Sequence, residues 1–181
     1  QGNYLIDVHG NRYLDGVSSL WCNVHGHAHP DLNAAIARQS EQIAHSTMLG
    51  LANMPSILLA KELIRVAPTG LTRVFYSDAG ATAVEIALKI AYQYWQLRGV
   101  SQKQKFASLV EAYHGDTLAA MSVGYSEVFH HYYQPLLSST FRLTPPHVFR
   151  FDQGMPESDA TAAPIAEARA VLSAHHHEIA A

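Results

Sequence analysis

Apolar residues recur with helical spacing after a short apolar run near the middle of the chain. Residues 73–76 include a branched residue and two aromatic residues and follow a stretch with proline and glycine, which predicts a short buried strand. Apolar positions then recur every three to four residues from Gly80 to about Arg98, which predicts a helix. Its apolar face comprises Val84, Ala87, Leu88, Ala91, Tyr94 and Trp95. Glu85 and Lys89 fall on the opposite face, where their spacing allows a favourable charge pair.

The connection between this strand and this helix holds only small or capping residues. The first turn of a helix has N–H groups without intrahelical acceptors, and the helix dipole adds partial positive charge there. Gly80 and Ala81 would let a phosphate approach these groups closely. The alternative is an ordinary connection in which Ser77 or Asp78 caps the helix. Neither a Walker loop nor a dinucleotide fingerprint is present, so a phosphate bound here would belong to a smaller cofactor.

The chain before this region predicts a hairpin and two helices. Residues 4–7 and 12–15 form two strand patterns joined by a turn, whereas residues 16–22 predict irregular structure. Amphipathic helices are expected over residues 30–43 and 55–66, because a proline opens each segment and apolar residues follow at helical spacing.

The chain after the central helix predicts a second strand over residues 105–110, parallel to the first because a helix connects them. A short helix is expected over residues 118–123, a loop-rich stretch over 129–151 and a polar connector over 153–163. A last helix should open at Pro164 and continue to the end of the chain. Strands alternating with helices predict an α/β fold with a mostly parallel sheet.

The loop after the second predicted strand contains an aromatic residue, Tyr113. Ligands bind at the carboxyl ends of parallel strands, so this loop and the Gly80 turn should face the same crevice. Tyr113 could stack there on a flat heteroaromatic ring, or it could be an ordinary core tyrosine. Trp21 has the same two interpretations.

Composition narrows the classes of function. The 181 residues are 48% apolar and 15% charged, which predicts a packed core rather than disorder. A net charge of -3 gives no footprint for nucleic acid, and no apolar run approaches the roughly 20 residues of a membrane span. Cys22 is the single cysteine, which fits a reducing, cytoplasmic location.

The histidines, twelve in number, do not predict a metal site. His25, His27 and His29 alternate, but Gly26 and Pro30 interrupt any regular strand that could aim them together. The run at residues 175–177 would point in three directions on a helix, so it could not hold one ion.

Several segments together resemble the class III, pyridoxal-phosphate-dependent aminotransferases. Residues 77–81 and 85–89 are similar to the phosphate turn and helix of that family, and residues 113–117 to its aromatic stacking loop. Residues 18–27 and 93–96 narrow the resemblance to the branch that aminates 8-amino-7-oxononanoate to 7,8-diaminononanoate in biotin biosynthesis.

The resemblance implies a fold type I domain, with a mostly parallel sheet and helices on both faces, and a homodimer with active sites at the subunit interface. It implies that the Gly80 and Ala81 backbone holds the phosphate of pyridoxal 5′-phosphate, and that Tyr113 packs on the pyridine ring and contacts substrate. Leu20 and Trp21 are expected to line the substrate pocket. Many relatives carry tryptophan at the position of Leu20, and the Leu-Trp pair favours lysine over S-adenosylmethionine as amino donor.

Family members are much longer than this chain, so the resemblance implies an internal fragment with an incomplete sheet. Residues 1–48 would belong to the small domain and a connecting segment, and residues 49–181 to the first half of the large cofactor-binding domain. The Schiff-base lysine is expected beyond Ala181, so this fragment alone should be inactive. Two alternatives are another class III aminotransferase acting on ω-amino acids, and a non-catalytic fragment that binds phosphate or supplies dimer surface.

Overall fold

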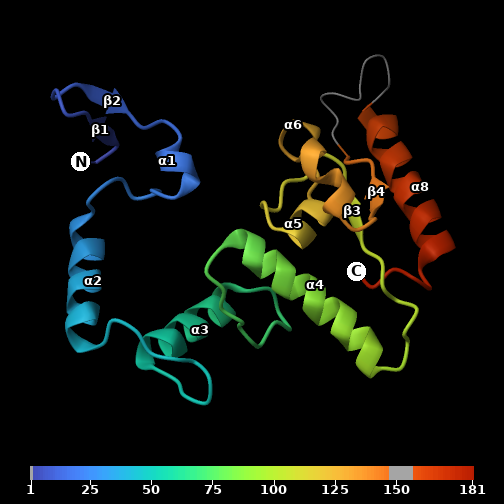
Figure 1. The fold of residues 1–181 in the computed structure, drawn as a ribbon, viewed down its shortest axis with the longest axis horizontal. Helices are drawn as coiled ribbons and strands as arrows, with labels where there is room; N and C mark the ends of the chain where they lie inside the picture. Colours follow the sequence, from blue (N-terminus) through green and yellow to red (C-terminus); the bar gives the residue numbers. More distant parts are fainter. Residues whose placement is uncertain (1, 147–156) are drawn as a thin grey trace. The chain divides into compact units, whose positions relative to one another are not determined.

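A computed structural model describes residues 2–146 and 157–181 of the chain. The chain divides into two compact units, Gln1–Val74 and Phe75–Ala181, and each is described by itself (Figure 1). The boundary between the small and large domains expected from the sequence stays a prediction.

The first unit begins with the expected hairpin. Strands β1 (Tyr4–Ile6) and β2 (Arg12–Leu14) pair antiparallel, with Tyr4 opposite Leu14. The Asp7 carboxylate accepts the backbone N–H groups of His9 and Asn11, each at 2.8 Å, and so closes the turn. The hairpin prediction is therefore confirmed.

A left-handed turn follows the hairpin. The short element α1 (Ser18–Trp21) has positive φ at all four residues, between 47° and 73°, so the regular right-handed pattern is absent there, as predicted. Left-handed backbone is costly for residues other than glycine, so a run of four such residues requires strong local support.

Two right-handed helices complete the first unit: α2 (Pro30–Gln42) and α3 (Met54–Val66). Each has proline in its first turn, where the missing N–H costs no hydrogen bond. Asn53 caps α3, because its side-chain oxygen accepts the N–H of Ser56 at 3.0 Å. Both helix predictions are confirmed to within about one residue.

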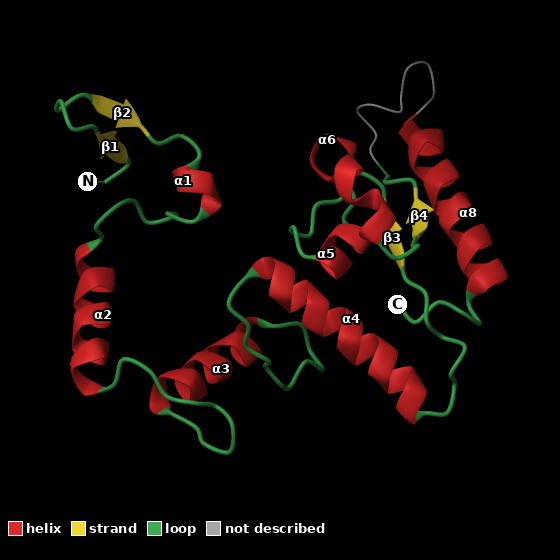
Figure 2. Cartoon of the chain, in the orientation of Figure 1, coloured by secondary structure: helices red, strands yellow, loops and turns green. Residues whose placement is uncertain are grey.

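The second unit is built on a parallel strand pair (Figure 2). Its elements in chain order are α4 (Gly80–Leu97), β3 (Ala107–Leu109), α5 (Leu118–Val123), α6 (Glu127–His130), the 3-10 helix η1 (His131–Leu136), β4 (Phe141–Leu143) and α8 (Glu157–His175). Strand β3 pairs parallel with β4, with Ala107 opposite Phe141. Helix α5 packs on α4 and β3, and α8 packs on β4. The predictions of α4, α5 and strand β3 are confirmed, but the expected parallel relation of β3 to a strand at residues 73–76 is wrong, because β3 pairs with β4.

Four further expectations about this region were wrong. Residues 73–76 form no strand, because no described segment pairs with them, and Phe75 is exposed. Strand β4 lies in the stretch predicted as loop, since three residues are too few for an alternating pattern to show. Helix α8 begins at Glu157, so Pro164 lies inside it; the alanines near Pro164 favour helix strongly. The chain leaves that helix after His175 and turns.

The end of the chain returns to the sheet. Ile179 bridges Lys105 in parallel, and the Ala107 N–H donates to the Ala181 carbonyl oxygen at 2.9 Å. Among the described residues of this unit, the buried apolar side chains include Ala120, Met121, Val123, Leu143 and Ile179. Arg142 on β4 donates to the carbonyl oxygens of Ser122 and Val123, which end α5 without intrahelical partners. Residues 147–156, part of the predicted loop and connector, lie outside the described residues.

Candidate active site

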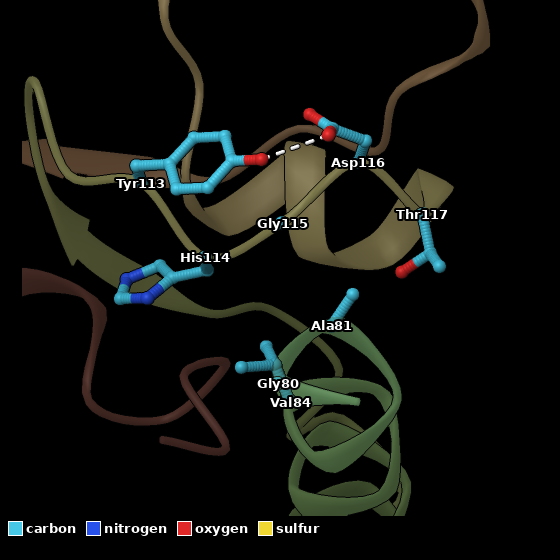
Figure 3. A pocket seen from close by; sticks show the side chains of 8 residues that line it. All are labelled: Gly80, Ala81, Val84, Tyr113, His114, Gly115, Asp116 and Thr117. Atoms are coloured by element: carbon cyan, nitrogen blue, oxygen red, sulfur yellow. Dashed lines mark hydrogen bonds between the residues drawn. The ribbon is translucent and has the colours of Figure 1, made fainter. Parts of the chain in front are cut away.

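A pocket in the second unit lies between the start of α4 and the loop that follows β3 (Figure 3). It is lined by Gly80, Ala81, Val84, Tyr113, His114, Gly115, Asp116 and Thr117. The structure therefore brings together three residues singled out from the sequence: Gly80, Ala81 and Tyr113. Leu20 and Trp21 belong to the other unit.

Within the described residues, no side chain caps the first-turn amides of α4. Ala79 occupies the N-cap position and makes no side-chain cap, so the alternative of a helix capped by Ser77 or Asp78 is wrong. The Thr82 hydroxyl accepts the Ala79 N–H at 3.1 Å and lies 2.7 Å from Asp78 Oδ1, to which it donates. This bond lowers the pKa of Asp78. The turn is thus ordered without blocking the N–H groups that an anion would bind.

The loop after β3 passes directly against this helix start. Gly115 has φ of +106°, and a Cβ there would lie 2.5 Å from Ala81 Cβ and 2.9 Å from Ala81 Cα. Only glycine fits this position, because any side chain would be both strained and in collision. Thr117, two residues after Gly115 and also lining the pocket, has a buried hydroxyl oxygen with no hydrogen-bond partner within the described residues.

Two neighbouring side chains, Asp116 and His130, hold Tyr113 in place in this loop. Its hydroxyl donates to Asp116 Oδ2 at 2.8 Å, as Figure 3 shows, and its ring stacks on His130 with centroids 6.1 Å apart. The hydrogen bond to Asp116 raises the pKa of Tyr113, because the neighbouring carboxylate disfavours a phenolate. The same bond, followed by that from His130, lowers the pKa of Asp116.

Leu20 and Trp21 lie on the left-handed turn of the first unit, with 68% and 71% of their surface exposed. Asp15 holds that turn: its carboxylate accepts the Ser19 N–H at 2.9 Å and the Ser19 hydroxyl at 2.8 Å. His27 Nε2 lies 2.7 Å from the same carboxylate. The turn therefore has the local support that its backbone requires, and it displays two large apolar side chains.

The sequence interpretation missed several residues of these sites. Asp116 and Gly115 lie in the segment 113–117 that resembles the aromatic stacking loop, but no role was predicted for them, and the sequence pattern gave no signal for His130 or Asp15. A buried histidine and a turn-holding aspartate have no characteristic spacing, so only their three-dimensional contacts identify them. The spacing of Glu85 and Lys89 predicted a charge pair on the polar face of the helix, but Glu85 accepts the Ala119 N–H at 2.9 Å, which ties α4 to the start of α5.

The lysines do not line the pocket. Lys103 Nζ donates to the Ile179 carbonyl oxygen at 2.8 Å and lies over the Trp95 ring, and Lys105 Nζ donates to Ser139 at 3.1 Å. Lys89 lies along α4 beyond the pocket, and Lys61 belongs to the other unit. The pocket in this chain thus offers backbone donors, an aromatic face and a carboxylate, with no amine.

The described part of the chain shows neither a metal cluster nor a membrane-spanning helix. Within residues 2–146 and 157–181, no three histidine, cysteine or carboxylate side chains gather to hold a metal ion. Across the same residues, no helix combines the length and the hydrophobicity that crossing a membrane requires.

A helix N-terminus facing an aromatic loop at the carboxyl end of a parallel strand is typical of the ligand sites of α/β domains. The model of one family, aminotransferase class III, matches residues 1–181. The chain therefore belongs to the class III aminotransferase family.

Individual relatives agree with this assignment. The chain is 55% identical over 150 residues to the adenosylmethionine-8-amino-7-oxononanoate aminotransferase of Methanocaldococcus jannaschii, covering 83% of this chain and 32% of that protein. The crystal structure of the enzyme of that name from the same organism superposes with a TM-score of 0.87 at 47% identity, covering 99% of this chain and 38% of the other.

A PLP-bound aminotransferase mutant from Vibrio fluvialis superposes with a TM-score of 0.89 at 29% identity, covering 99% of this chain and 40% of the other. These likenesses confirm the prediction of a fold type I α/β domain. The chain spans about a third to two fifths of the length of the relatives it matches, 32% and 38% for the two proteins from Methanocaldococcus jannaschii.

Proposed function

We propose that the full-length protein is a pyridoxal-5′-phosphate-dependent aminotransferase that converts 8-amino-7-oxononanoate to 7,8-diaminononanoate in biotin biosynthesis. The observation that carries the cofactor assignment is the pocket that joins the Gly80 turn to the Tyr113 loop. The substrate assignment rests on the 55% identity to a relative named for this reaction.

The residues of the pocket fit the proposed cofactor. The uncommitted amides of Gly80 and Ala81 would hold its phosphate, and the unpartnered Thr117 hydroxyl supplies a further donor beside them. Ala81 fills the space that a Cβ on Gly115 would need, so glycine at position 115 lets the loop pass close to the start of α4. Tyr113 offers an aromatic face for the pyridine ring. The cofactor, when bound, supplies the electron sink of transamination.

Three further assignments are part of the same proposal. Leu20 and Trp21 would line the substrate site, as expected for two exposed apolar residues on a firmly held turn. The protein would act in the cytoplasm as a homodimer with active sites at the subunit interface. Residues 1–48 and 49–181 would belong to its small and large domains.

The proposal has two versions, which differ in whether S-adenosylmethionine or lysine is the amino donor. The name of the Methanocaldococcus jannaschii relative gives adenosylmethionine as donor, whereas the Leu20-Trp21 pair favours lysine. The test incubates the full-length protein and pyridoxal phosphate with 8-amino-7-oxononanoate, and measures diaminononanoate with each donor in turn.

We expect product with a preference for lysine. A clear preference for S-adenosylmethionine would overturn the donor assignment alone. No product with either donor, together with amine transfer to ω-amino acid partners, would overturn the substrate assignment.

A further inference from the structure

His130 is the largest fully buried side chain among the described residues, with 1% of its surface exposed. It lies at the end of α6 and does not line the pocket, so the proposed function gives it no role. Burying an imidazole costs free energy unless both ring nitrogens have partners. Both nitrogens of His130 have partners, and these partners determine which nitrogen donates and which accepts.

The backbone fixes which nitrogen of His130 carries the proton. The Ser126 N–H donates to His130 Nδ1 at 3.0 Å, so Nδ1 must carry a lone pair. A neutral imidazole with an acceptor at Nδ1 has its hydrogen on Nε2. His130 Nε2 lies 3.1 Å from Asp116 Oδ1 and therefore donates to it. The His130 ring is thus hydrogen-bonded to the Ser126 amide on one side and to the Asp116 carboxylate on the other, so it fixes where that carboxylate lies.

Asp116 needs such an anchor, because 69% of its side chain is exposed. An unrestrained surface aspartate exchanges between rotamers and holds no partner at a constant position. In this structure each Asp116 carboxylate oxygen has its own donor: Oδ1 accepts from His130, and Oδ2 accepts the Tyr113 hydroxyl at 2.8 Å. The Tyr113 ring also lies nearly parallel to the His130 ring, with an interplanar angle of 18°.

We propose that His130 is a positioning residue that fixes Asp116 and, through it, sets the orientation of the Tyr113 ring at the cofactor pocket. This inference depends on the proposed function in one respect, which is that the face of the Tyr113 ring binds the cofactor. The competing account is purely structural: Ser126 is the N-cap residue of α6, and His130 would merely satisfy its amide.

Two substitutions of similar shape separate these accounts in the full-length protein. His130→Gln can place an amide N–H near the position of Nε2, and so keeps a donor for Asp116 while losing the bond to Ser126. His130→Asn can place an oxygen near the position of Nδ1, and so keeps the acceptor for Ser126 while losing Asp116. The measurement is the pKa of Tyr113 in cofactor-free protein, by NMR of ¹³Cζ-labelled tyrosine, with Tyr113→Phe to assign the signal.

Positioning predicts that His130→Gln keeps the raised pKa of Tyr113, whereas His130→Asn returns it toward the ordinary value. Affinity for pyridoxal phosphate should fall about fivefold in His130→Asn and less in His130→Gln, as expected for the loss of one hydrogen bond. The reverse order, or no change of the Tyr113 pKa in His130→Asn, would overturn the inference.

A measurement on the wild-type protein tests the inference even if the variants do not fold. Nitrogen NMR of ¹⁵N-labelled histidine should find His130 as the neutral tautomer with hydrogen on Nε2. Hydrogen on Nδ1 would overturn the inference without any substitution. Neither NMR measurement requires turnover, so an inactive wild-type protein would refute the proposed function and still leave the role of His130 decided.

Discussion

Substituting alanine for Gly115 would place a methyl group between the loop after β3 and the start of α4. The backbone there has φ of +106°, which costs a residue with a Cβ about 1–2 kcal/mol. The new methyl group would also lie 2.5 Å from Ala81 Cβ, and the neighbour is the start of a helix rather than the end of a flexible side chain. Relieving such an overlap costs about 1–3 kcal/mol. We therefore expect Gly115→Ala to destabilise the protein by about 2–5 kcal/mol, a large part of a typical domain stability.

Gly99→Ala is the matched control for this substitution. Gly99 also has positive φ, +74°, but a Cβ there would meet nothing within 4 Å. Gly99→Ala should lower the stability only by the backbone strain, about 1–2 kcal/mol, and should leave the pocket intact. The difference between the two variants then measures the close approach of loop and helix.

The assay follows urea unfolding of the cofactor-free full-length protein by circular dichroism, and pyridoxal phosphate binding by absorbance. We expect Gly115→Ala to unfold at lower urea than Gly99→Ala and to bind the cofactor about tenfold more weakly or worse, because the loop must move away from Ala81. Equal stability and equal affinity in the two variants would refute the close packing on which the pocket depends.

Two further predictions concern Tyr113 and the turn of the first unit that carries Leu20 and Trp21. Tyr113→Ala should weaken pyridoxal phosphate retention about fivefold or more and lower turnover, because the stacking face is lost; unchanged binding and kinetics would contradict the assignment. The Asp15 carboxylate should stabilise the turn of the first unit mainly above the unfolded pKa of about 4. The Ser19 N–H, then the Ser19 hydroxyl and His27, lower the pKa of Asp15, so this stabilisation is lost as pH falls through that lowered value. Acid unfolding monitored by circular dichroism should show it, and Asp15→Asn should remove that part of the pH dependence.

Local patterns in the sequence were enough for most elements of both units. The hairpin and helices α2 to α5 follow from periodicity, prolines at helix starts and turn residues, all of which act within a few residues. The Gly80 turn and the Tyr113 loop were found in the same way, because each is a short motif with its own chemistry.

Tertiary structure alone decided the contacts that join distant segments. The strand partner of β3 and the return of residues 178–181 beside Lys105 depend on which backbone groups meet, and side-chain periodicity does not carry that information. The approach of Gly115 to Ala81 and the bond from His130 to Asp116 likewise require the loop, α4 and α6 to be placed together. The sequence determined which residues could form a phosphate turn and an aromatic wall; folding determined their spacing, because that spacing is set by packing between elements far apart in the chain.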